Sequence, residues 1–249
     1  MVQSREQVDR FTSEGFFITD PMLDLELLDE IAHDFDSARE VMDRELDEKR
    51  SELTTRGQRY FIPRMHQASE ACKRLVTDAQ LTGIAVDIVG PNVRLYWNQA
   101  VIKPAETGAS FAWHQDSGYG VLEPLEYLTF WIPLDDATLE NGCIWVIPGS
   151  HKRGLLQHIV DEDMGDEVGY RGQEEGIPVP VKRGQVVGFS SLMLHRSGPN
   201  TTEAPRRAYV VQYCTTETVS VETGEPWGDG LVVARGGRTG IWQFIGKIW

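Results

Sequence analysis

The sequence predicts a mainly β protein of the α+β class, in which a jelly roll or similar barrel follows a helical N-terminal part. Residues 1–91 carry apolar residues at helical spacing, Gly90-Pro91 marks a change of character, and short β-rich runs separated by turn residues follow from Val93 onward. Because β domains of 249 residues commonly form one unit, we expect a single domain. Its expected parts are a helical region at 1–91, a β core at 92–216 and a C-terminal extension at 217–249.

The first expected elements are a short helix, a brief strand and a long amphipathic helix. Gly15 could end the first helix as a C-cap, and Phe16-Phe17-Ile18 could form the strand. Asp20-Pro21 resembles an N-cap followed by a proline at the first helical position. Beyond it, apolar residues at helical spacing predict one long helix: Leu23, Leu27, Ile31, Phe35, Ala38, Met42 and Leu46.

The next expected helix spans 69–89 and ends at Gly90-Pro91, which supplies a permissive C-cap and a helix stop. The acidic, glycine-containing stretch 157–176 is too long for a simple hairpin, so it is either an active-site lid or a surface loop. The β-rich runs predict strands at 94–97, 101–102, 127–132, 144–147, 186–189 and 209–213.

Charge and cysteine content exclude several classes of function. The chain has 24 basic and 38 acidic residues, a formal net charge of −14, and no run rich in Lys and Arg, so we expect no binding to nucleic acid or to anionic membranes. Cys72, Cys143 and Cys214 lie far apart, which argues against a disulfide framework or a zinc ribbon. The N-terminus lacks an apolar signal segment and no stretch approaches a membrane span, so we expect a cytoplasmic protein.

The sequence Trp113-His114-Gln115-Asp116 is the first candidate for chemistry. Residues two apart on a strand point to the same face, so His114 and Asp116 could offer an imidazole and a carboxylate to one metal ion. The pair alone is weak evidence, because a histidine beside a carboxylate is usually only a hydrogen-bonded pair. His195 follows a later apolar run and is the candidate third ligand, brought across the barrel by its strand.

Two histidines and one carboxylate leave three coordination positions open. This arrangement suits an iron(II) ion that must also bind a co-substrate and oxygen, whereas a structural zinc ion would be closed by four ligands. Arg206 opens a strand-like run, and its planar guanidinium matches a carboxylate, so it could hold an anionic co-substrate. Strand alternation lets only one of Arg206 and Arg207 point inward, and we expect Arg207 to be exposed. Ser197 shares the facing of His195 and is either a hydrogen-bond donor in this site or a turn residue.

Other histidines and acidic residues are interpreted as structural. His151 lies in a Pro-Gly-Ser-His turn and is expected to orient a loop. Asp135-Asp136 precedes a turn and is not expected to act as a paired acid and base. The remaining histidines considered have no ligand-like partner at a useful spacing: His33, His66 and His158.

Three tryptophans and one lysine are interpreted from their positions on predicted strands. Trp113, Trp131 and Trp145 are expected in the core or in a pocket wall, because large aromatic residues on strands are commonly buried. Lys103, before Pro104, is expected at a solvent-facing edge.

Three stretches resemble the phytanoyl-CoA dioxygenase family: WHQDSGYG at 113–120, FWIPLDDATLENGCIWVIPGSHK at 130–152, and LHRSGPN at 194–200 with its following Arg206. The resemblance covers roughly Val93 to Tyr213, and its middle block is the most specific part. It implies a double-stranded β-helix and an enzyme that uses iron(II), 2-oxoglutarate and O2. The N-terminal third shows no specific match.

The resemblance also implies roles for individual residues. His114, Asp116 and His195 would bind the iron, and Arg206 would bind the distal carboxylate of 2-oxoglutarate. The residues that would line the co-substrate pocket are Gln99, Trp131 and Ser197. Similar halogenases replace the carboxylate ligand by a small residue, so the presence of Asp116 favours hydroxylation.

The expected reaction is hydroxylation of a C–H bond of a small organic metabolite, with succinate and CO2 as co-products. Two alternatives stay open: an iron dioxygenase of the cupin type that does not use 2-oxoglutarate, and a non-catalytic jelly-roll binding protein. A fatty acyl-CoA would favour basic groups near the pocket mouth, and this acidic chain offers none, so a small metabolite is the expected substrate. Neither its identity nor the oligomeric state follows from the sequence.

Overall fold

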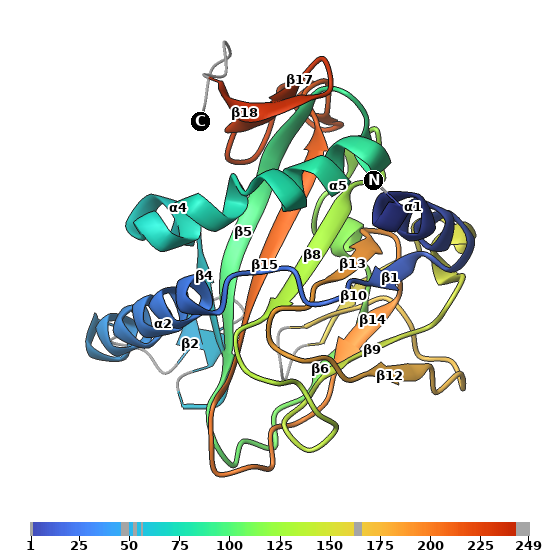
Figure 1. The fold of residues 1–249 in the computed structure, drawn as a ribbon. Coiled ribbons are helices and arrows are strands. Elements are labelled where there is room, and N and C mark those ends of the chain that lie inside the picture. Colours follow the sequence, from blue (N-terminus) through green and yellow to red (C-terminus); the bar gives the residue numbers. More distant parts are fainter. Residues whose placement is uncertain (1, 46–49, 52–53, 56, 162–165, 243–249) are drawn as a thin grey trace.

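The structure is a computed structural model that describes residues 2–45, 50–51, 54–55, 57–161 and 166–242 (Figure 1). Two antiparallel sheets form the walls of a jelly roll, which confirms the predicted fold class. The larger sheet has eight strands, with β4 (Tyr60–Pro63) paired to β5 beside the main path. In order along that path they are β1 (Phe16–Ile18), β13 (Val187–Ser190), β8 (Leu128–Pro133), β15 (Arg206–Thr215), β5 (Val93–Lys103), β17 (Val232–Arg235) and β18 (Arg238–Trp242).

The smaller sheet carries two of the predicted ligands, because its strands β14 and β6 contain His195 and His114. Its order is β12 (Ile177–Val179), β9 (Ile144–Val146), β14 (His195–Ser197) and β6 (Phe111–His114). Short two-stranded pairings surround the two sheets: β2 (Arg50–Ser51) with β3 (Thr54–Thr55), β10 (Ile159–Val160) with β11 (Glu167–Val168), and β7 (Leu122–Glu123) with β16 (Val219–Ser220).

Helices cover the outer face of the larger sheet (Figure 1). The segment α5 packs against the three central strands β5, β8 and β15, and α2 packs against α4 and β4. Their apolar faces and the outer face of the sheet form the larger hydrophobic core. The helices are α1 (Val2–Glu14), α2 (Leu25–Glu45), α3 (Met65–Ala68), α4 (Glu70–Val76) and α5 (Ala79–Val89). None of them has an apolar stretch of the length that a membrane crossing requires, within the part of the chain described.

The sequence predicted the helices in outline and misplaced two boundaries. Gly15 ends α1 with a φ of 84°, as expected of a C-cap glycine. The long helix begins at Leu25 rather than at Asp20-Pro21, because the Asp24 carboxylate accepts the backbone N–H of Glu26 at 2.9 Å and so caps the helix there. Its predicted last position, Leu46, lies outside the described residues.

The predicted helix over 69–89 is in fact two helices. Ser69 caps α4 by accepting the backbone N–H of Cys72, and the Asp78 carboxylate accepts the N–H groups of Gln80 and Leu81 to cap α5. Asp78 has an extended backbone that interrupts the helical path. A strong N-cap inside an apolar periodic run is therefore the signal that separates the two helices.

Strand β15 divides the molecule into two interiors by simple alternation. Tyr209, Val211 and Tyr213 face the core beneath the helices. Arg206, Val210 and Gln212 face the space between the two sheets, where the predicted site lies. Strands from outside 92–216 also join this sheet, since β1 pairs with β13 and both β4 and β17 pair with β5.

Candidate metal centre and its two pockets

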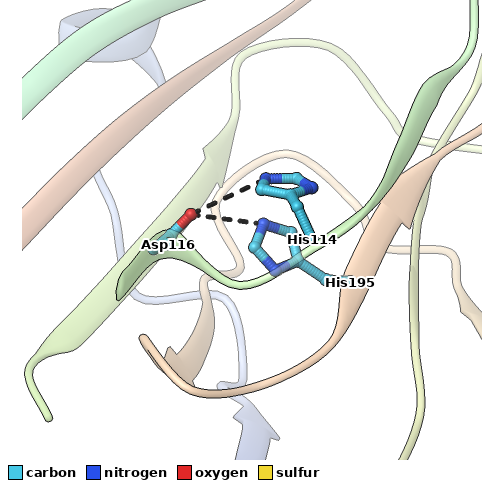
Figure 2. Close-up of side chains that lie close together, drawn as sticks. All are labelled: His114, Asp116 and His195. Atoms are coloured by element: carbon cyan, nitrogen blue, oxygen red, sulfur yellow. Dashed lines mark ion pairs between the residues drawn. The ribbon is translucent and has the colours of Figure 1, made fainter. Parts of the chain in front are cut away.

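The structure brings His114, Asp116 and His195 together (Figure 2). His114 ends β6 and His195 begins β14, and the two residues are direct partners in the antiparallel pairing. His195 thus reaches the site from the neighbouring strand of the same sheet and not from across the barrel. The Asp116 Oδ1 atom lies 3.8 Å from His114 Nε2 and 3.4 Å from His195 Nε2.

Asp116 does not lie on a strand, contrary to the sequence expectation. Strand β6 ends at His114, and Asp116 opens the 3-10 helix η1 (Asp116–Tyr119). The extended residue Gln115 separates the two ligands, and the turn that follows directs the carboxylate toward both imidazoles. The spacing of two therefore has its effect through a strand end and a turn, and not through strand alternation.

Backbone carbonyls orient both imidazoles. The Nδ1 atom of His114 lies 2.9 Å from the Ala112 carbonyl oxygen, and that of His195 lies 3.0 Å from the Met193 carbonyl oxygen. Because a carbonyl only accepts, each Nδ1 carries the proton and each Nε2 presents a lone pair to the centre. Burial lowers the pKa of His114 well below its usual value, and the neighbouring His195 lowers it further. Neutral imidazoles of this kind are metal ligands.

The second oxygen of Asp116 is fixed by two donors that the sequence reasoning missed. Thr129 Oγ1 donates to Asp116 Oδ2 at 2.6 Å, and Gln212 Nε2 donates to the same atom at 2.9 Å. These bonds leave Oδ1 directed at the histidines. Gln212 shares the inward face of β15 with Arg206, so strand alternation from Arg206 is the signal that could have identified it.

The backbone between the two ligands in β6 and η1 is also held in place. His158 Nε2 accepts the backbone N–H of Gln115 at 2.9 Å, while His158 Nδ1 donates to the Leu156 carbonyl. The buried Gln115 side chain donates to the carbonyls of Gly154 and Leu192. His158 is not a ligand, as predicted, but it supports the ligand segment from 157–176. Within that stretch β10 and β11 pair in antiparallel fashion, and the Gly169 N–H donates to the Trp113 carbonyl.

A buried arginine faces the triad from the larger sheet. Arg206 has no exposed surface, and its Nη2 donates to the Gly142 carbonyl at 3.1 Å. Its Nε and Nη1 atoms have no hydrogen-bond partner in the described structure. Burial lowers the pKa of Arg206 to about 10, so it remains charged at pH 7. A buried cation with unpaired donors is costly without an anion, and a carboxylate would match these donors.

The expected co-substrate residues line one cavity with this arginine and the triad, which we call the arginine pocket. The Arg206 guanidinium lies over the Trp131 ring at 5.3 Å, and Thr129 forms the wall beside Asp116. The predicted residues found in this lining are Gln99, Trp131, Ser197, Arg206, His114, Asp116 and His195. Arg207 points the other way and is half-buried, not exposed, because it forms ion pairs with Asp135 and Asp36.

Lys103 contradicts the expectation of a solvent-facing edge. It is only 2% exposed, pairs in register with Arg206, and donates to the carbonyls of Ala109 and Gly198. Burial lowers its pKa to about 6, and the Arg206 charge adds to this effect. The edge position is covered because β5 pairs with β15 and β4 on its two sides. Lys103 therefore links the segment before β6 to the segment after β14 by hydrogen bonds. The strands β6 and β14 carry His114 and His195.

A second cavity of about 200 Å³ adjoins the triad at His114 and Asp116, and we call it the aromatic pocket. Strand β5 contributes two adjacent residues, Tyr96 and Trp97, because a register shift leaves Tyr96 without a partner opposite Gln212 and Tyr213. The complete lining is Phe61, Pro63, Tyr96, Trp97, Gln99, Phe111, His114, Asp116, Tyr119, Tyr127, Gln212 and Trp227. Sequence reasoning singled out only the two ligands and Gln99 of this set.

The remaining predicted structural residues keep structural contacts. Asp135 and Asp136 accept from Arg207 and Lys182, and His151 Nε2 lies 3.3 Å from the Thr12 carbonyl of α1. His66 Nδ1 lies 2.8 Å from Asn98 Nδ2 and 3.9 Å from Asp229 Oδ2. Trp113 and Trp145 enclose the Arg196 guanidinium at 5.1 and 4.6 Å. Within the described residues, the triad is the one group of three metal-binding side chains that meets in space.

Comparisons with known proteins agree with this geometry. Residues 11–208 match the family model of phytanoyl-CoA dioxygenase. Phytanoyl-CoA dioxygenase domain-containing protein 1 of Mus musculus is 35% identical over 120 residues, which cover 45% of this chain and 41% of that protein. The chain spans about half the length of the curated relatives it matches.

Two solved structures have the same fold. The apo form of the non-haem monooxygenase ThoJ has a TM-score of 0.74 at 23% identity, covering 95% of this chain and 86% of that chain. The epimerase SnoN, solved in complex with Fe3+, α-ketoglutarate and nogalamycin RO, has a TM-score of 0.69 at 20% identity, covering 88% and 86%. At these identities the likeness is one of fold.

Proposed function

The chain belongs to the phytanoyl-CoA dioxygenase family, and on this basis we propose that it is an iron(II)- and 2-oxoglutarate-dependent oxygenase that hydroxylates a C–H bond of a small organic molecule. Members of this family use iron(II), 2-oxoglutarate and O2. The observation that carries the proposal is the buried Arg206, whose unpaired donors face the same cavity as the His114, Asp116 and His195 triad.

The donor set fits iron(II). Two neutral imidazole nitrogens and one carboxylate oxygen would bind one face of the ion and leave the other face open. Thr129 and Gln212 hold the carboxylate, and the Ala112 and Met193 carbonyls hold the rings, so the ligands are oriented before the metal binds. When bound, iron(II) and 2-oxoglutarate would activate O2 to oxidise a C–H bond, with succinate and CO2 as co-products.

The arginine pocket would position the co-substrate. Arg206 would pair with the distal carboxylate of 2-oxoglutarate through guanidinium donors that have no protein partner. Gln99, Trp131 and Ser197 line the same cavity and would restrict the carbon chain and exclude water. Asp116 leaves no room at its coordination position for a halide, which favours hydroxylation over halogenation.

The proposal is tested by anaerobic titration of the purified protein with iron(II) and then with 2-oxoglutarate. We expect the visible charge-transfer band of iron(II) chelated by a 2-oxo acid, followed by slow succinate formation when O2 is admitted. His195→Ala should give neither signal, while His33→Ala, on the exposed outer side of α2, should match the wild type. Oxygen uptake without 2-oxoglutarate would instead favour a cupin-type dioxygenase, and failure to bind iron would favour a binding protein.

Hydroxylation is distinguished from other outcomes by product mass. A screen of candidate substrates should yield a product 16 mass units heavier under ordinary O2 and 18 mass units heavier under 18O2. A product of unchanged mass or one that has lost two hydrogens would keep the cofactor assignment and contradict hydroxylation. A cytoplasmic location and the absence of nucleic-acid binding stay predictions from the sequence.

A further inference from the structure

The aromatic pocket contains two rows of rings. The first row runs from Tyr127 through Tyr96 and Trp227 to Trp97, with centroid separations of 4.8, 5.7 and 6.3 Å. The planes of the two tryptophans differ by only 8°. Because each ring packs on the next, the row presents an extended wall and not separate side chains.

The second row leads to the triad. Phe61 lies 5.3 Å from Phe111, Phe111 lies 4.6 Å from His114, and His114 lies 5.8 Å from Tyr119, measured between ring centroids. Both rows line the same cavity, and the second includes His114, a predicted iron ligand. A molecule that packs along these walls would have a ring edge near the metal.

Two hydroxyl groups inside this cavity have no protein partner. Tyr96 and Tyr127 are 5% and 4% exposed, and neither phenol oxygen forms a hydrogen bond in the part of the chain described. Burial raises the pKa of both phenols, so they are neutral donors. The Gln99 side-chain carbonyl accepts from Trp97 Nε1 at 3.2 Å. Donors that line a cavity and have no protein partner can bind an acceptor on a ligand.

The charges around the pocket disfavour an ionic ligand. Its lining has no lysine or arginine, and its one carboxylate is Asp116, which the triad uses. The Arg64 guanidinium lies over the Trp97 ring at 5.7 Å. It forms an ion pair with Asp229 at 3.4 Å. An anion would find no unpaired cation. A cation would find no carboxylate in the lining other than Asp116.

We infer that the aromatic pocket binds an uncharged, flat ring compound with an oxygen atom that accepts from Tyr96 or Tyr127. Such a compound would be the substrate of the oxygenase proposed above, and this part of the inference rests on the proposed function. The rings hold the molecule by stacking, and the two phenols fix which ring edge points at His114 and Asp116.

Equilibrium dialysis of the whole protein against three probes of matched size tests this inference: 2-naphthol, 2-naphthoate and trimethyl(2-naphthyl)ammonium. We expect 2-naphthol to bind at least tenfold more tightly than either ion. Equal or tighter binding of the carboxylate or the ammonium compound would overturn the inference. So would the absence of 2-naphthol binding up to its solubility limit.

Variants identify the two donors. Tyr96→Phe and Tyr127→Phe should each weaken 2-naphthol binding about fivefold, as expected for loss of one neutral hydrogen bond, and the double variant should remove the preference over naphthalene. Tyr170→Phe, at an exposed ion-pair site with Arg153 and Glu174, is the matched control and should leave binding unchanged. Unchanged binding in the double variant would contradict the assignment of the donors.

The dialysis result is independent of the proposed oxygenase activity, because it needs neither iron nor turnover. The charge-transfer band of iron(II) with 2-oxoglutarate could form while an ionic probe binds more tightly than 2-naphthol. In that case the substrate inference fails and the oxygenase proposal stands. If the band never forms and 2-naphthol still binds most tightly through Tyr96 and Tyr127, the oxygenase proposal fails and the ligand class stands.

Discussion

The arginine pocket and the aromatic pocket meet at the triad and differ in the kind of interaction they offer. The arginine pocket has a buried cation with unpaired donors, whereas the aromatic pocket has ring walls and neutral hydroxyls. They share Asp116, Gln212 and Gln99 among their lining residues. An ionic pocket suits one fixed anionic co-substrate, and a neutral pocket selects its ligand by shape. On the proposed function, the arginine pocket serves the reaction that the family shares. The aromatic pocket selects the substrate of this chain.

The largest expected effect comes from removing the metal that both pockets share. Asp116→Ala should lower iron(II) affinity and succinate formation by at least 1000-fold, because a facial site with only two ligands binds poorly. 2-Naphthol binding to the metal-free protein should change less than threefold. Iron content after dialysis and the dialysis assay measure the two effects. Iron retained at wild-type level in this variant would show that the triad is not the metal site.

The next effect separates the two pockets. Arg206→Met should raise the apparent dissociation constant for 2-oxoglutarate by about 100-fold, since it removes a pair of charge-assisted hydrogen bonds in a buried site. Binding of 2-naphthol should stay within a factor of two. The adjacent Arg207→Met is the control, because Arg207 pairs with Asp135 and Asp36 on the opposite face. It should reduce stability and leave 2-oxoglutarate affinity unchanged; an equal loss in both variants would contradict the assignment.

The arginine pocket was largely predictable from sequence because it follows strand alternation. Once Arg206 is placed inward on β15, Val210 and Gln212 follow at even spacing. The family recognition, confirmed by the match over 11–208, located His114, Asp116 and His195. The prediction for Lys103 was wrong. A charged residue before a proline is typical of a solvent-facing edge, but the strand of Lys103, β5, pairs with β15 and β4.

The aromatic pocket was not predictable, because its residues come from irregular features. Tyr96 enters through a bulge in β5, Tyr119 through a 3-10 turn, and Trp227 through a segment after β16. Phe61 belongs to β4, where no strand was expected. These residues are brought together by tertiary pairing, and no local period links them. The same reason explains the split between α4 and α5, which one N-cap at Asp78 decides.

A smaller effect is expected at Gln212, which is one of the residues that line both pockets. Gln212→Leu should weaken metal binding about tenfold, because Asp116 Oδ2 loses one of its two donors and the carboxylate becomes free to turn. Thr129→Val should have a similar effect, and the pair together should exceed either alone. Competition for iron(II) with a chelator of known affinity measures the change. Unchanged affinity in the double variant would show that the carboxylate does not depend on these donors.

The last expected effect is on stability and not on binding: the free energy of unfolding should depend on pH through Lys103. Burial lowers the pKa of Lys103 to about 6, below the value of about 10.4 expected in an unfolded chain. Between these values the unfolded state binds more protons, so this group makes the free energy of unfolding increase as the pH rises. Lys103→Met removes that contribution, and the stability of the wild type relative to the variant should increase from pH 6.5 to pH 9. Urea denaturation at three pH values measures this difference.

The exposed Lys73→Met is the control and should give a constant difference. A constant or decreasing difference for Lys103→Met would mean that the lysine keeps its proton beside Arg206.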